Sequence, residues 1–218
     1  MSVASSRRMT QQNRVDPWGA LHAVPSRGSL MGNRGILHDD GGNIVRMWAS
    51  PTWVACVLNF RNRTSPGTFR SGHYSKLFFL DEATAFAAGH RPCGECQRAR
   101  YFEFRDSWKS ANLAEGELDR FSLPLLDRQL HAERASRSKQ RPKVTFASLV
   151  SNLPFGALVE WAGDAWLVGD TKELRRWSFD GYGSPVSAPA EAVNVLTPAS
   201  IVKTFGRGFR PRVHPTGL

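Results

Sequence analysis

The chain has 218 residues, of which 41% are hydrophobic and 11% aromatic, so it can bury a real core and is not a disordered chain. Its 29 Lys and Arg residues against 19 Asp and Glu residues give a net charge of +10, and a protein this basic usually meets a polyanion, most often nucleic acid. No apolar run reaches the roughly 18–20 residues of a membrane-spanning helix, and the opening lacks a secretory signal, so we expect a cytoplasmic protein without membrane contact.

The first half of the chain alternates between turn signals and β-type runs. Residues 1–30 are polar and basic, and we interpret them as a flexible arm. A hairpin is expected over 32–46 because Asp-Asp-Gly-Gly separates two apolar pieces. The β-branched and aromatic runs 52–60 and 74–80 predict two strands.

Three helices are expected in the middle of the chain. Asp81 is suited to cap a short helix ending at Ala88, with Gly89 as the left-handed residue after it. A longer helix is predicted over 95–109, where Tyr101, Phe104 and Trp108 share one face. A third is predicted over 124–135, and the basic stretch 136–143 follows as a linker.

The last part of the chain returns to a β pattern. Residues 156–170 predict two strands joined by a tight turn, and 193–196 predict another; the basic end is either a tail or a loop packed on the body. We therefore expect an α+β protein. Its parts are an arm (1–30), a metal-binding module (31–112), a basic helix and linker (113–145), and a β-rich module with a basic tail (146–218).

The three cysteines point to a metal site. Cys93 and Cys96 form a Cys-x-x-Cys knuckle at the start of a helix, where amide groups stabilise thiolates. A structural zinc site takes four ligands, usually Cys or His. Cys56 is the remaining thiol, so at least one ligand must be another type of side chain. We expect Zn²⁺ to be bound by Cys93, Cys96, Cys56 and His38, with His73 as the alternative to His38.

The stretch KLFFLDEATAFAAGHRPCGECQ, residues 76–97, resembles the second half of the zinc-binding N-terminal domain of the Ada methylphosphotriester DNA repair protein. The residues that match this family are Ala87, Ala88, Gly89, Arg91, Pro92, Cys93, Cys96 and Gln97. The resemblance implies a small zinc-stapled α/β module that acts on DNA. The rest of the chain resembles uncharacterised bacterial proteins.

The first half of the Ada pattern is altered in this chain. That family places two cysteines on the preceding strand, and the first of them accepts the methyl group. Here His38 resembles the first ligand, Gly42 stands where the second thiol belongs, and Cys56 is the candidate replacement. An imidazole cannot accept the methyl group irreversibly, so the resemblance implies a structural zinc site unless Cys56 takes the acceptor role.

Basic residues around the knuckle are the candidate nucleic-acid contacts. They are Arg34, Arg91, Arg98, Arg100, Arg105 and Lys109, and we expect Arg98→Ala or Arg100→Ala to weaken DNA binding without changing the fold. His131 and Glu133 form a second candidate cluster for acid–base or metal-dependent cleavage. On a helix, however, residues i and i+2 point apart.

Three functions remain open at this point. The first is a zinc-stabilised DNA-binding protein, related to repair or modification. The second is a DNA-acting enzyme, either a methyl-transfer protein using Cys56 or a nuclease or base-processing enzyme using His131 and Glu133. The third is a zinc-stapled protein-interaction module. The sequence leaves DNA and RNA both open and says nothing of the oligomeric state.

Overall fold

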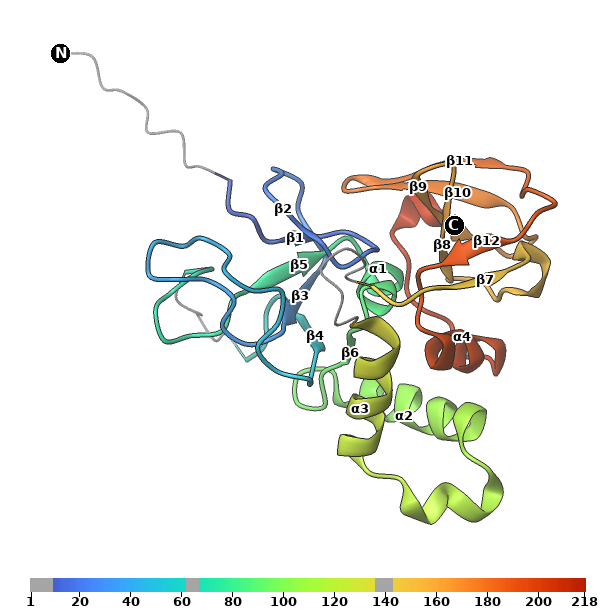
Figure 1. Cartoon of the computed structure of the whole chain (residues 1–218), viewed down its shortest axis with the longest axis horizontal. Helices are drawn as coiled ribbons and strands as arrows, with labels where there is room; N and C mark the ends of the chain where they lie inside the picture. The colour runs from blue at the N-terminus through green and yellow to red at the C-terminus, as the bar shows by residue number, and fades with distance from the viewer. Residues whose placement is uncertain (1–9, 62–66, 136–142) are drawn as a thin grey trace.

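The computed structural model describes residues 10–61, 67–135 and 143–218. Within these ranges the chain forms two six-stranded sheets and four α-helices (Figure 1). The first sheet lies in the N-terminal half and the second in the C-terminal half, with α2 and α3 packed beside them. The expectation of an α+β fold is confirmed.

The first sheet has the strand order β2-β1-β5-β3-β4-β6, in which β1 with β5 and β4 with β6 are parallel pairs and the other pairs are antiparallel. Its strands are β1 (Arg14–Val15), β2 (Leu21–His22), β3 (Leu30–Asn33), β4 (Val54–Val57), β5 (Leu77–Phe79) and β6 (Arg91–Pro92). The helices of this half are α1 (Glu82–Ala87), α2 (Arg98–Asn112) and α3 (Leu123–Arg134), with a 3-10 helix at Glu115–Arg120.

The second sheet is antiparallel throughout and has the order β11-β10-β9-β8-β12-β7. Its strands are β7 (Phe146–Ser148), β8 (Leu158–Trp161), β9 (Asp164–Val168), β10 (Leu174–Ser178), β11 (Gly181–Val186) and β12 (Val193–Val195). Helix α4 (Ala199–Gly206) follows, and 3-10 helices lie at Val150–Asn152 and Pro215–Gly217.

Alternation along the strands of the first sheet sends one set of side chains into a core and leaves the other set facing outward. Leu77 and Phe79 of β5 are fully buried and pack with Ala85 and Ala88 at α1. The ring of Phe79 lies so close to Gly32 of β3 that a Cβ there would come within 2.4 Å of it. Glycine at this position therefore lets the aromatic ring cross the neighbouring strand.

Helix α1 is fixed at both ends and buried on all sides. Asp81 caps it by accepting a hydrogen bond from the amide of Thr84 at 2.8 Å, and Gly89 follows it with φ +83°. The same carboxylate accepts hydrogen bonds from the Tyr182 hydroxyl and the His214 amide. The predicted short helix and its cap are confirmed, and α1 is joined directly to the C-terminal half.

Glu82 makes a second connection between the halves of the chain. Its carboxylate pairs with Arg100 of α2 at 2.6 Å and accepts from the amide of Arg212 at 2.8 Å. Arg100 also donates to the carbonyl of Arg210 and lies 3.9 Å over the ring of Phe209. The chain end that follows α4 is thus packed onto the body, which decides between the two predicted alternatives.

Two parts of the sequence interpretation need correction. Residues 10–30 are not an arm, because β1 and β2 join the first sheet and Val15 is fully buried. The expected hairpin over 32–46 forms its turn at Asp39–Asn43 but carries only a single bridge between His38 and Ile44. Most of the predicted linker, 136–142, lies outside the described residues.

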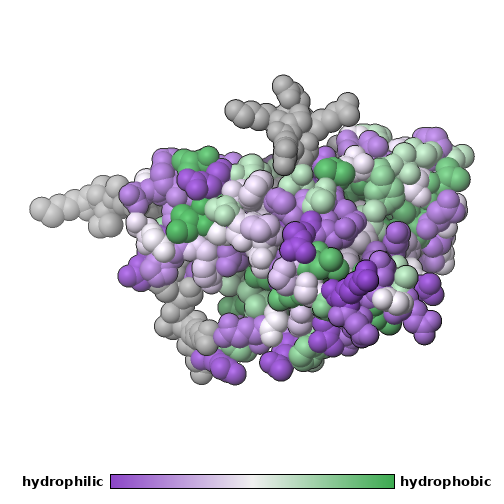
Figure 2. All heavy atoms as spheres, turned by 60° about the horizontal axis from the view of Figure 1, so that its bottom comes forward, coloured by the Kyte–Doolittle hydropathy of each residue, from purple (hydrophilic) through white to green (hydrophobic). Residues whose placement is uncertain are grey.

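In the part of the chain that the structure describes, no helix is long and apolar enough to cross a membrane. Figure 2 shows hydrophobic residues in separate groups among hydrophilic ones on the face that it presents. Four buried arginines and four buried carboxylates balance one another; they are Arg34, Arg91, Arg100, Arg134, Asp16, Asp81, Glu82 and Asp127. The excess positive charge therefore belongs to the remaining residues.

We predict that Arg100→Ala lowers the free energy of unfolding by about 3–5 kcal/mol, because it leaves the buried Glu82 carboxylate without its cation. Arg98 is exposed on the same helix, so Arg98→Ala is the matched control and should change stability by less than about 0.5 kcal/mol. Urea unfolding followed by circular dichroism measures both. Equal midpoints for the two variants would contradict a structural role for Arg100.

Candidate metal centre

The Cys-x-x-Cys knuckle is held against strand β4 by main-chain hydrogen bonds. Strand β6 pairs in parallel with β4, and the amide of Cys93 donates to the carbonyl of Ala55 at 2.9 Å. The Gln97 side chain donates to the same carbonyl at 2.8 Å, and the Gln97 amide donates to the carbonyl of Cys93. The knuckle therefore lies beside the residue that follows Ala55, which is Cys56.

Alternation in β4 sends Cys56 to the opposite face from Ala55, which is buried in the core. The sulfur atoms of Cys56, Cys93 and Cys96 consequently come within 4.8 Å of one another, and all three residues are half-buried free thiols. Tetrahedral zinc with Zn–S bonds of roughly 2.3 Å spaces its sulfurs by about 3.8 Å. The cluster fits a thiophilic cation after a small contraction.

Three side chains, those of Cys56, Cys93 and Cys96, form the group that can hold a metal ion. Every Cys, His, Asp and Glu of the chain lies in the described residues, and no fourth one joins the three thiols. A divalent ion bound by these sulfurs keeps a fourth position for solvent or for a bound molecule, as in catalytic rather than structural zinc sites. The three-thiol group can hold a metal ion, as the sequence predicts.

Hydrogen bonds within the cluster and burial give the three thiols different pKa values. A hydrogen bond from Cys56 and main-chain amides at the turn stabilise the Cys93 thiolate and lower its pKa to about 5, against the opposing effect of burial. The hydrogen bond to Cys93 and burial raise the pKa of Cys56, and burial raises the pKa of Cys96. Of the three thiols, Cys93 is therefore the one that ionises first.

His38 is not close to the sulfurs and is not a ligand in this arrangement. Its Nε2 faces the carbonyl of Arg70 at 3.2 Å, and its Nδ1 lies 2.6 Å from the hydroxyl of Ser75. A carbonyl only accepts hydrogen bonds, so Nε2 carries a proton and donates to Arg70, while Nδ1 is held by the Ser75 hydroxyl. The ring stacks on Phe69 at 4.8 Å, and the alternative ligand His73 is exposed beside Ser71.

The structure divides the six candidate nucleic-acid residues into two groups. Arg34, Arg91 and Arg100 are buried, Arg91 in a two-bond pair with Asp127 at 2.7 and 2.9 Å. Arg34 lies 4.3 Å over the ring of Trp53 and donates to the carbonyl of Gly19. These three are structural cations and are not presented to a phosphate. The other group lies at the surface of α2; it consists of Arg98, Arg105 and Lys109.

His131 and Glu133 do not form a joint site. The Glu133 carboxylate accepts from the amide and hydroxyl of Ser200 at the start of α4, at 3.0 and 2.6 Å. The ring of His131 packs edge-on against Trp48 and Trp53, and burial lowers its pKa. Glu133 thus caps a helix, and the cleavage hypothesis has no geometric support from this pair.

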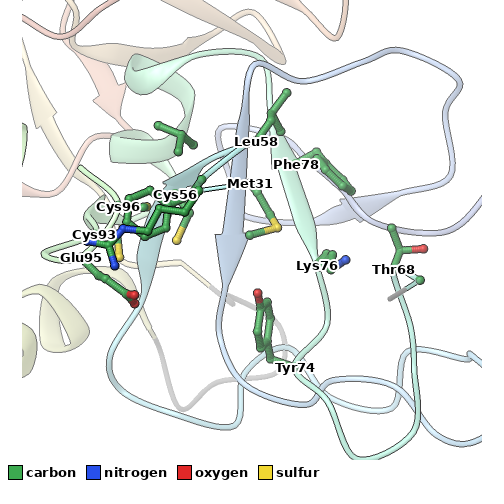
Figure 3. A pocket seen from close by; sticks show the side chains of 14 residues that line it. Met31, Cys56, Leu58, Thr68, Tyr74, Lys76, Phe78, Cys93, Glu95 and Cys96 are labelled. Atoms are coloured by element: carbon green, nitrogen blue, oxygen red, sulfur yellow. The ribbon is translucent and has the colours of Figure 1, made fainter. Parts of the chain in front are cut away.

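A pocket of about 930 Å³ lies beside the three sulfurs, on the outward face of the first sheet (Figure 3). It is lined by Cys56, Cys93 and Cys96 together with aromatic, apolar and cationic side chains and the carboxylate of Glu95. Sequence reasoning missed these lining residues; they include Met31, Leu58, Thr68, Tyr74, Lys76 and Phe78. Only the spacing of Tyr74, Lys76 and Phe78 at every second position signals a shared face.

Comparisons with protein-family models, with curated proteins and with solved structures found no match to this chain. The resemblance of residues 76–97 to the Ada zinc domain therefore stays a prediction. Cys56 lies among the thiols, as the methyl-acceptor hypothesis requires, and that hypothesis stays a prediction too.

We predict that the protein binds one Zn²⁺ per chain and that Cys56→Ser, Cys93→Ser and Cys96→Ser each greatly weaken binding. His38→Ala should keep the full equivalent of metal, because the imidazole is not in the thiol cluster. Metal saturation at a thousandfold excess over Kd should stabilise the wild type by about 4 kcal/mol. Metal analysis after dialysis and thermal melts with and without a chelator measure these effects.

A second prediction concerns protons. Zinc binding at pH 7 should release about two protons, since Cys93 is already ionised while Cys56 and Cys96 still carry theirs. Zinc affinity should therefore rise with pH near neutrality, and below pH about 5 a third proton should compete. Calorimetry in buffers of different ionisation enthalpy counts the protons. Release of no protons would contradict thiolate ligation.

Proposed function

We propose that this protein binds one Zn²⁺ through Cys56, Cys93 and Cys96 and binds nucleic acid at the surface around that centre. The observation that carries the proposal is the three-thiol cluster without a fourth protein ligand, placed at a pocket that also holds cationic and aromatic side chains. Zinc is the cation favoured by this soft donor set among common cellular divalent ions without redox chemistry.

The distribution of charge supports a polyanionic partner. Segments 1–9, 62–66 and 136–142 contain six Lys and Arg residues and no acidic residue, so they account for six of the ten net positive charges. Segment 62–66 is flanked by Arg61 and Gly67, and both of these line the pocket. Lys76 adds a further cation to the lining, and burial lowers its pKa, an effect that a nearby anion would offset.

The role in DNA repair or modification that the sequence predicts would give an open coordination position on the metal a chemical use. Cys56, Cys93 and Cys96 would hold the metal at the edge of the pocket, and a fourth position on it would be open to a strand bound there. A protein-interaction module, the alternative from another class, requires no such cavity beside the metal. It also predicts a shallow salt dependence toward DNA.

The test is binding of a fluorescent oligonucleotide to the zinc-loaded protein between 50 and 200 mM salt. We expect log Kd to rise linearly with log salt, with a slope that counts phosphate contacts. Lys76→Ala should lower that slope by about one unit. Lys203→Ala is the matched control, since Lys203 is exposed on α4 and does not line the pocket, and it should leave the slope unchanged.

A slope near zero for the wild type, or equal affinities for an oligonucleotide and an uncharged peptide nucleic acid, would contradict nucleic-acid binding. Loss of binding in Lys203→Ala together with no effect of Lys76→Ala would place the interface elsewhere on the molecule.

A further inference from the structure

A row of side chains crosses the first sheet and leads to the metal ligands. Strand register places Arg14 of β1 beside Phe78 of β5, Phe78 beside Met31 of β3, and Met31 beside Cys56 of β4. Directly paired residues point to the same face of a sheet, so these four side chains share the outward face. The guanidinium of Arg14 covers the outer end of the row, 4.8 Å over the ring of Phe78.

The opposite wall of the pocket comes from the segment before β5. Figure 3 shows Tyr74 reaching from this segment toward the space between Met31 and Glu95, with Lys76 and Thr68 on the far side from the cysteines. The amide of Lys76 donates to the carbonyl of Thr68 at 3.1 Å, which closes the segment into a loop. Tyr74 keeps 36% of its surface exposed although it lines a concave site.

His38, once expected to bind the metal, holds this wall in place. Its ring contacts Phe69, the carbonyl of Arg70 and the hydroxyl of Ser75, and these three groups span the loop. Ser75 is fully buried, and its hydroxyl also accepts from the amide of Leu37. The wall is therefore a built part of the fold, anchored to the main chain on both sides of the imidazole.

The pocket combines three recognition features at fixed places. A flat apolar floor of Phe78 and Met31 and an aromatic wall at Tyr74 favour a planar unsaturated ring. Lys76 supplies positive charge on the side away from the sulfurs, Arg61 is a second cation of the lining, and the one carboxylate of the lining, Glu95, lies beside the sulfurs (Figure 3). The volume of about 930 Å³ is of the size that holds one small-molecule group or one nucleotide. A base inside a duplex is stacked on both sides and cannot reach this floor, whereas an unpaired base can.

We infer that the pocket beside the three sulfurs takes one unpaired nucleotide, its base between Tyr74 and the Phe78–Met31 floor and its phosphate toward Lys76, on the side away from Glu95. This inference rests on the proposed function and names its substrate: a strand with an exposed base, rather than a regular duplex. The base would then lie next to the open coordination position of the metal.

The experiment compares three labelled probes with the zinc-loaded full-length protein: a regular duplex, the same duplex with one bulged base, and the bulged duplex with an abasic residue at the bulge. We expect the bulged probe to bind about tenfold or more tightly than the other two. Tyr74→Ala should abolish this preference, and Tyr74→Phe should retain it because the ring is kept. Trp48→Ala is the matched control; Trp48 is also an exposed aromatic but does not line the pocket.

Equal affinity for all three probes, with the salt dependence intact, would overturn the pocket inference and leave the proposed function standing. No measurable binding of any probe would overturn the proposed function. Competition of a free nucleoside monophosphate with the bulged probe, lost in Tyr74→Ala, would support the pocket chemistry. If Tyr74→Ala keeps the preference for the bulged probe, the exposed base binds at another site.

Discussion

The parallel pairing of β6 with β4 is the constraint on which the metal centre depends. The two residues of β6 are too few for a stable strand on their own, yet their register, with Val54 beside Arg91 and Ala55 beside Pro92, brings the next residue, Cys93, beside Cys56. Gln97 strengthens the contact by donating to the same carbonyl of Ala55 that accepts from Cys93. A cation at the sulfurs would in turn link β4 to the start of α2, so metal binding and the edge of the first sheet stabilise each other.

Several arginines of this protein are buried, so its positive surface charge depends on burial as well as on composition. Trp53 lies between two guanidinium groups, Arg34 at 4.3 Å and Arg134 at 4.1 Å, and each of them donates to main-chain carbonyls. Burial lowers the pKa of both arginines to about 9. Arginine keeps its charge at neutral pH even so, and its flat, weakly hydrated group tolerates the interior better than an ammonium group would. Basic residues near a knuckle are therefore not all surface residues.

The sequence predicted those features of the fold that depend on neighbouring residues alone, such as helix ends and tight turns. The Asp81 cap, the Gly89 terminus and the Ala162-Gly163 turn follow from the backbone preferences of those residues, and each is found in the structure. The Cys-x-x-Cys knuckle is also a local pattern, and Cys56 was predicted as a ligand because it is the third cysteine of the chain. His38 was misassigned because its role depends on Ser75 and Arg70, more than 30 residues away. Arg100 was misassigned because its partner Glu82 lies on another helix.

Strands β1, β2 and β10 were missed for a different reason. Strands β1 and β2 have two residues each, too few for an alternation to be visible. Their stability comes from pairing, of β1 with β5 and of β2 with β1, rather than from their own sequence. Strand β10 carries Arg175 and Arg176 and so does not look like a strand that packs on a core. The pocket cannot be recognised in the sequence either, because its lining comes from strands β3, β4 and β5, from the segments after β4 and before β5, and from the Cys-x-x-Cys turn.

Helix α1 has one further consequence for the molecule. Ala83 and Ala87 pack with Leu158 and Leu196 of the second sheet, while Ala85 and Ala88 pack with the first, so six residues serve two cores at once. The indole of Trp177 in β10 donates to the Thr84 hydroxyl of this helix at 3.0 Å. Neither half can therefore melt without exposing a face of α1. Trp177 thus sits where its fluorescence would report loosening that begins on the other side of the protein.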